Sequence, residues 1–113
     1  MPINLLEGMQ MATINDLKRT PWGTADDVNM VGIVDGERVF CVSTPSHGGY
    51  YVPTALLHYI PQEYQDRAER WSGSPNWYEE DCEWASVAVT FPQLFPTEAL
   101  EHARLTITWR TKE

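Results

Sequence analysis

A short glycine-rich segment contains residues that could take part in catalysis or ligand binding. Residues 43–50 read STPSHGGY, so His47 stands directly before Gly48 and Gly49 among hydroxyl side chains. A histidine titrates near neutral pH, which makes His47 a candidate general base. Two consecutive glycines let the backbone approach a ligand closely or adopt a positive φ, and exposed amides there can bind an anion. The alternative is a plain turn between two strands, with His47 exposed and without a catalytic role.

A second segment, WYEEDCEWA over residues 77–85, gathers four carboxylates in five residues between aromatic side chains. These are Glu79, Glu80, Asp81 and Glu83. On a helix the three glutamates share one side, where like charges cost about 0.2–0.5 kcal/mol per pair. A solvated helix start tolerates that cost because the helix dipole favours acids there, and a surface that contacts a basic partner fits equally well. Glu79, Glu80 and Glu83 are therefore candidate partner-binding residues.

Cys82 and His47 form a candidate nucleophile and base, with Asp81 or Glu80 as the carboxylate that orients the imidazole. The surrounding acids raise the pKa of a thiol, however, and so disfavour the thiolate. A buried structural cysteine is the simpler interpretation of Cys82. In a third interpretation, His47 and Asp81 pair as an internal clasp that locks the loop against the acidic segment.

Tryptophan is abundant, with five in the chain. Most tryptophans are buried in cores, where each contributes a large apolar area. Trp71 and Trp77 flank a loop of serine, glycine and proline at residues 72–76, and a tryptophan at such a place can anchor a partner. We therefore add Trp71 and Trp77 to the candidate partner-binding residues.

The sequence predicts neither a metal site nor a cofactor. The three histidines, at positions 47, 58 and 102, lack the spacing of zinc ligands, and two cysteines cannot form a four-cysteine site. Cys41 and Cys82 are expected as free thiols in a reducing compartment. Spacings of the phosphate-loop or dinucleotide-binding type are absent as well.

The elements that must position these residues indicate an α+β fold: a small antiparallel β-meander of three or four strands packed against two or three helices. Strands are expected over residues 28–34, 38–43 and 50–52. Asp35-Gly36 is a strong hairpin signal between the first two, and TPWG at residues 20–23 is typical of a turn. Helices are expected over residues 54–60, 62–71 and about 77–90. The segment 97–109 is expected to begin as a helix and to end either as a helix or as a terminal strand.

Length and composition limit the class of protein. A chain of 113 residues is expected to be one domain, with residues 1–19 as a flexible N-terminal segment. An apolar content of 42% argues against disorder, and a net charge of −8 argues against direct nucleic-acid binding. No apolar run approaches the ~20 residues that cross a membrane, and the start does not resemble a signal peptide. We therefore expect a cytoplasmic protein.

Four blocks carry a resemblance to a family: TPWG (residues 20–23), VSTPSHGG (42–49), WYEEDCEWA (77–85) and Phe91-Pro92. In their order and spacing they resemble an uncharacterised domain of unknown function found in proteins of bacteria, plasmids and bacteriophages. The resemblance covers residues 20–96, roughly. It implies no activity or catalytic residue, but it does imply a mobile-element origin.

Together these features favour a small acidic, non-enzymatic binding protein of a phage or mobile element. Its expected partner is a host protein with a basic surface, such as a nucleic-acid-binding complex of CRISPR or restriction defence, which it would inhibit through an acidic and aromatic surface. The alternative is a small enzyme or ligand-binding domain that uses His47, Asp81 and Cys82 near the Gly48-Gly49 loop.

Overall fold

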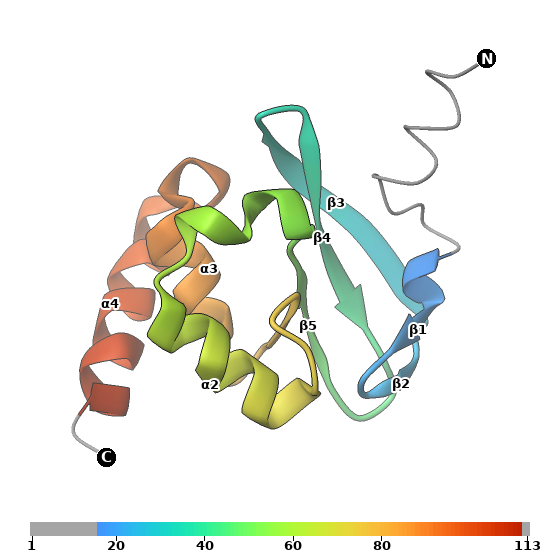
Figure 1. Cartoon of the computed structure of the whole chain (residues 1–113). Helices are drawn as coiled ribbons and strands as arrows, with labels where there is room; N and C mark the ends of the chain where they lie inside the picture. Colours follow the sequence, from blue (N-terminus) through green and yellow to red (C-terminus); the bar gives the residue numbers. More distant parts are fainter. Residues whose placement is uncertain (1–15, 112–113) are drawn as a thin grey trace.

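The computed structural model describes residues 16–111 and has the α+β architecture expected from the sequence (Figure 1). A four-stranded antiparallel sheet has the order β3-β4-β5-β6, so the expected meander of three strands gains an edge strand from later in the chain. Its strands are β3 (Asp27–Val34), β4 (Glu37–Ser43), β5 (Gly48–Tyr51) and β6 (Trp77–Glu79). A separate hairpin consists of β1 (Arg19–Thr20) and β2 (Gly23–Thr24).

Within residues 16–111, six helical segments accompany the strands. Three are 3₁₀ turns: η1 (Asp16–Lys18), η2 (Thr54–Tyr59) and η3 (Pro92–Leu94). The α-helices are α2 (Gln62–Ser72), α3 (Trp84–Thr90) and α4 (Thr97–Thr111). Most of the N-terminal segment 1–19 that the sequence predicts to be flexible lies outside the described residues. Within the described part, no helix is both long and apolar enough to cross a membrane.

Two predicted turns are confirmed. Asp35 and Gly36 have φ angles of 51° and 80° and join β3 to β4, with Val34 opposite Glu37. Positive φ angles at both central residues define a type I′ turn, whose twist matches that of the two flanking strands. Glycine adopts a positive φ without strain. In the TPWG turn, the Thr20 hydroxyl donates to the Gly23 carbonyl at 2.7 Å, which holds Trp22 at the tip of the β1–β2 hairpin.

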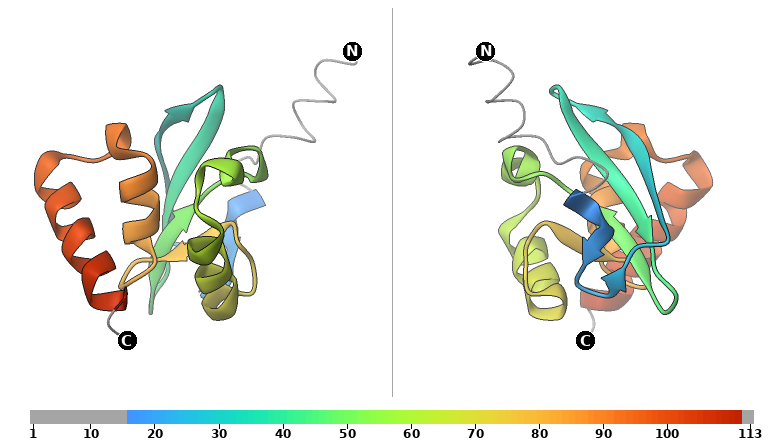
Figure 2. Two further views of the ribbon diagram at one scale, coloured as in Figure 1. Left: turned by 60° about the vertical axis from the view of Figure 1, so that its left-hand side comes forward. Right: turned by 90° about the vertical axis from the view of Figure 1, so that its right-hand side faces the viewer.

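The core lies where the sheet meets the helices. Val39, Tyr50 and Tyr78 share one face of the sheet by register. They pack with residues of the helical segments or directly after them: Leu56, Ile60, Ala68, Val87 and Phe91. Helices α3 and α4 lie side by side (Figure 2), because alanines on both let their backbones approach closely. These are Ala85, Ala88 and Ala103.

The prediction of one helix over residues 77–90 is wrong in its first half. Trp77 and Tyr78 pair instead with Tyr51 and Tyr50 of β5, and such cross-strand aromatic pairs stabilise a sheet. The chain then turns through residues 80–83, and α3 begins only at Trp84. The turn separates the glutamates that a helix would have placed side by side.

The segment 97–109 is helical to its end, so its alternative as a terminal strand is wrong. Leu100, Ala103 and Ile107 recur at helical spacing and pack against α3. The β-branched Thr106 fits into this helix because its hydroxyl donates to the carbonyl of His102 at 3.0 Å. The predicted helix at 54–60 forms as the 3₁₀ segment η2.

A buried carboxylate joins the helices. Glu83 is 3% exposed and lies between two arginines: its Oε1 is 2.9 Å from Arg67 Nε of α2 and 3.5 Å from Arg110 Nη1 of α4. Arg110 also donates to the Cys82 carbonyl at 2.9 Å and to the Ser86 hydroxyl at 3.0 Å. Three separate parts of the chain therefore meet at one carboxylate.

We expect Glu83→Gln to destabilise the fold by about 3 kcal/mol, because it leaves two arginines near one another without their shared counter-charge. Equilibrium unfolding in urea, followed by circular dichroism, measures this. Glu69→Gln on the exposed side of α2 is the matched control and should change stability by less than about 0.5 kcal/mol. An equal effect of the two variants would show that the buried carboxylate is not a structural centre.

Candidate functional site: an acidic pocket walled by tryptophans

His47 is held by a tight turn between β4 and β5. The Thr44 amide and hydroxyl both donate to the His47 carbonyl, at 2.7 and 2.6 Å, and the His47 amide donates back to the Thr44 hydroxyl at 3.0 Å. These bonds fix the backbone of His47, while its side chain stays half exposed. The interpretation of this segment as a strand-connecting turn is correct, and the turn also orients a histidine.

The two glycines after His47 serve close packing. A Cβ atom at Gly49 would come within 2.5 Å of the Trp22 ring and of the Tyr78 carbonyl, and one at Gly48 within 2.5 Å of a Glu80 carboxylate oxygen. Of the two possibilities that these glycines offer, close approach and a positive φ, the structure uses close approach, since the positive φ angles of the described glycines lie at other positions. The pair lets the indole of Trp22 lie directly against the sheet beside His47.

Glu79 is the link between the histidine turn and the acidic segment. Its Oε1 accepts the amides of Asp81 and Cys82 at 2.9 and 3.3 Å, which shapes the turn after β6. Its Oε2 faces His47 Nδ1 at 3.8 Å. Burial raises the pKa of Glu79, and the charge of Asp81 raises it further against the lowering effect of the two amides. In the clasp expected between His47 and Asp81, the carboxylate that faces the imidazole is instead that of Glu79, at 3.8 Å.

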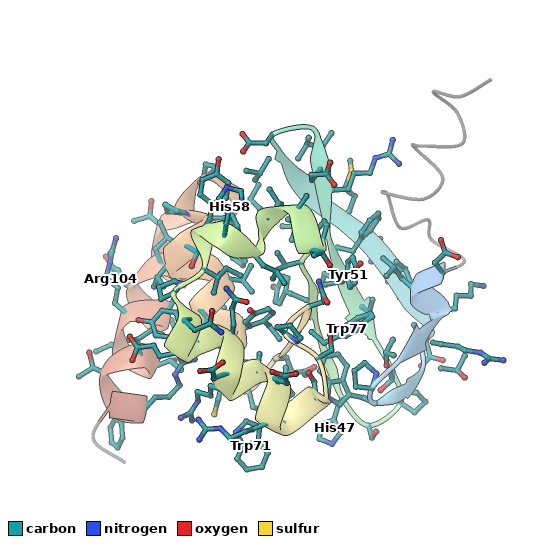
Figure 3. All side chains as sticks on the ribbon, viewed as in Figure 1. His47, Tyr51, His58, Trp71, Trp77 and Arg104 are labelled. Atoms are coloured by element: carbon teal, nitrogen blue, oxygen red, sulfur yellow. The ribbon has the colours of Figure 1, made fainter. Side chains whose placement is uncertain are left out.

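The histidine turn and the acidic segment form one side of a pocket of about 430 Å³. It lies where the β1–β2 hairpin, the β4–β5 loop, α2 and the turn after β6 converge, and Figure 3 shows His47 and Trp71 near one another at this end of the molecule. Its lining residues are Trp22, His47, Arg67, Trp71, Glu79, Asp81, Cys82 and Glu83. The Arg67 charge is paired with Glu83, so Glu79 and Asp81 leave the pocket negative.

The structure brings together some of the candidate residues and separates others. His47, Asp81, Cys82, Glu79 and Trp71 all line the pocket, and Trp71 is 71% exposed.

The other three candidate residues have different environments. Trp77 is half buried and packs edge-on against Trp22 and Tyr51. Glu80 is exposed beside Gly48 and is not among the lining residues. Glu83 lies in the pocket wall but is engaged with two arginines, so the prediction that it shares an exposed helix face with Glu79 and Glu80 is wrong.

Two lining residues were not recognised in the sequence. In the sequence Trp22 is recognisable only as part of a turn, because its contacts with Gly49 and Trp77 depend on the pairing of β5 with β6. Arg67 carries no local signal, because its role depends on Glu83, which is distant in the chain.

Cys82 is poorly suited to nucleophilic catalysis. Burial raises its thiol pKa, and the charges of Glu83, Glu79 and Asp81 raise it further, while Arg67 opposes them only in part. The reactive thiolate is therefore scarce at neutral pH. Both cysteines of the described chain are free thiols.

In a Cys41→Ser background, we expect iodoacetamide to alkylate Cys82 more slowly at pH 7 than it alkylates free cysteine, because only the thiolate reacts. The midpoint of the rate against pH should lie above that of free cysteine, as a raised pKa requires. Mass spectrometry of timed samples measures the rate. Alkylation faster than that of free cysteine at pH 7 would restore Cys82 as a nucleophile.

Comparison with protein families matches residues 15–112 to a domain of unknown function, DUF7007. The comparisons with curated proteins and with solved structures found no match. The matched stretch contains the sheet, the helices and every residue that lines the pocket. The resemblance to an uncharacterised domain is thus confirmed, and the chain belongs to the DUF7007 family.

Proposed function

We propose that this protein is a non-enzymatic binding module that takes a basic side chain of a partner protein into the tryptophan-walled pocket. One observation carries the proposal: the pocket combines two indoles, Trp22 and Trp71, with two carboxylates, Glu79 and Asp81, that no lysine or arginine of the described residues pairs with. Glu79 faces the imidazole of His47, at 3.8 Å. A lysine or arginine satisfies both features at once. Its positive charge would lie beside the two carboxylates. The same charged group would lie over an indole ring, and this cation–π contact contributes about 0.5–2 kcal/mol.

The rest of the surface supports a basic partner. The net charge of −8 speeds the encounter with a positively charged surface and suppresses binding to nucleic acid. Trp71 is 71% exposed, and an exposed tryptophan beside a pocket is typical of an interface anchor. We extend the proposal to a partner whose basic surface otherwise meets nucleic acid, such as a component of a host defence complex that a phage or mobile-element protein would inhibit.

A small ligand-binding or catalytic role remains the second candidate, because His47, Asp81 and Cys82 line the same pocket. The raised thiol pKa of Cys82 weighs against nucleophilic catalysis. Binding therefore fits these residues better than covalent chemistry does.

Asp81→Lys and Trp71→Ala should each weaken capture of the basic partner from a lysate of the host. We expect a loss of at least about tenfold for each, since one reverses a pocket charge and the other removes a candidate anchor. Immobilised protein, quantitative mass spectrometry of the bound fraction and a series of salt concentrations measure this. Binding by the wild-type protein should decrease as salt rises.

Two variants serve as matched controls. Asp66→Lys makes the same charge change on exposed α2 outside the pocket, and Trp109→Ala removes a tryptophan that is 73% exposed on α4. Both should retain the partner. The proposal is wrong if the pocket variants capture the same proteins in the same amounts as these controls.

A further inference from the structure

Three side chains of metal-binding type converge at the pocket from two separate segments. Ligand atoms of His47, Glu79 and Asp81 all lie within 4.8 Å of one another. His47 comes from the β4–β5 turn, and the two carboxylates come from the end of β6 and the turn after it. The set therefore depends on β5 and β6 pairing, which places Gly49 opposite Glu79.

The backbone holds this set in place. Glu79 Oε1 accepts two amides, which leaves Oε2 directed at His47 Nδ1, 3.8 Å away. The Thr44 bonds fix the histidine turn in the same way. Secondary hydrogen bonds of this kind orient the ligands of metal sites in proteins.

The distances suit an ion between the three groups. A separation of 3.8 Å is too long for a hydrogen bond, and ligand atoms on one zinc ion are separated by roughly 3–4 Å, given metal–ligand bonds of about 2.0–2.2 Å. His47 and Asp81 are exposed, so their side chains can close the remaining distance by rotation. Two carboxylates beside one another also gain from a cation that neutralises both.

We propose that His47, Glu79 and Asp81 bind one divalent transition-metal ion of the zinc class at the mouth of the pocket. The imidazole nitrogen selects such an ion over Mg²⁺ or Ca²⁺, which prefer oxygen ligands alone. Three protein ligands leave a coordination position open, where water or a partner group can bind.

This site goes beyond the proposed binding of a basic side chain and stands independently of it. The ion would use the same carboxylates, so metal and basic partner would compete for the pocket. Partner capture in the presence of a chelator tests the binding module without the metal, and a metal titration without any partner tests the ion site. Either proposal can therefore fail alone.

Isothermal titration calorimetry of the full chain with ZnCl₂ at pH 7.5 tests the site. We expect one ion per chain, with affinity at least about tenfold weaker in His47→Ala and in Asp81→Asn. His102→Ala and Asp66→Asn are the matched controls on exposed surface outside the site, and they should bind as the wild type does. Circular dichroism without metal checks that each variant is folded. His47→Gln replaces His47→Ala if the latter is not folded.

A second measurement uses the wild-type protein alone. The imidazole resonances of His47 in the nuclear magnetic resonance spectrum should shift on addition of one equivalent of Zn²⁺, and those of His102 should not. The proposal is overturned if Zn²⁺ does not bind at millimolar concentration, or if the ligand variants bind as tightly as the controls. It is overturned equally if Cys82→Ser abolishes binding while His47→Ala leaves it unchanged, because the thiol would then hold the ion.

Discussion

The carboxylate of Glu83, shared by Arg67 and Arg110, is the interaction on which the rest of the structure depends. An unpaired charge at 3% exposure would cost several kcal/mol, and the arginines that α2 and α4 bring to Glu83 offset that cost. Arg110 also donates to the carbonyl of Cys82 and lies 5.1 Å from the centre of the Tyr64 ring. One carboxylate thus fixes two helices and the backbone of the turn between β6 and α3.

That turn carries the candidate site, so the buried ion pairs and the pocket are parts of one arrangement. Four carboxylates within five residues would repel one another in a regular helix. The structure resolves this by giving each a different environment: Glu79 accepts backbone amides, Glu80 lies beside Gly48, Asp81 faces the pocket and Glu83 meets two arginines. Some of these carboxylates therefore stabilise the fold and others form an exposed negative site, so the segment does not present one continuous acidic surface.

What could be predicted from the sequence follows the range of the interactions involved. The Asp35-Gly36 hairpin and the β3–β5 strands were predictable because their signals are local. The segment from Trp77 was not, because its strand exists only by pairing with β5. Its residues Tyr78, Cys82 and Ala85 also recur at the spacing of one helix face, which favours a helix when the sequence is considered alone. The proximity of His47 and Glu79 could not be predicted for the same reason, because no sequence spacing relates two residues that the pairing of strands brings together.

Amide hydrogen exchange in an Arg110→Met variant tests the central role of the Glu83 carboxylate most directly, because it reports each segment separately. The substitution keeps an apolar chain of similar length and removes one of the two counter-charges. We expect the amides of residues 80–86 to lose protection while the paired strands β3 and β4 keep theirs. Unchanged exchange in residues 80–86, or an equal loss across the whole fold, would contradict the view that this carboxylate holds the turn that carries the pocket.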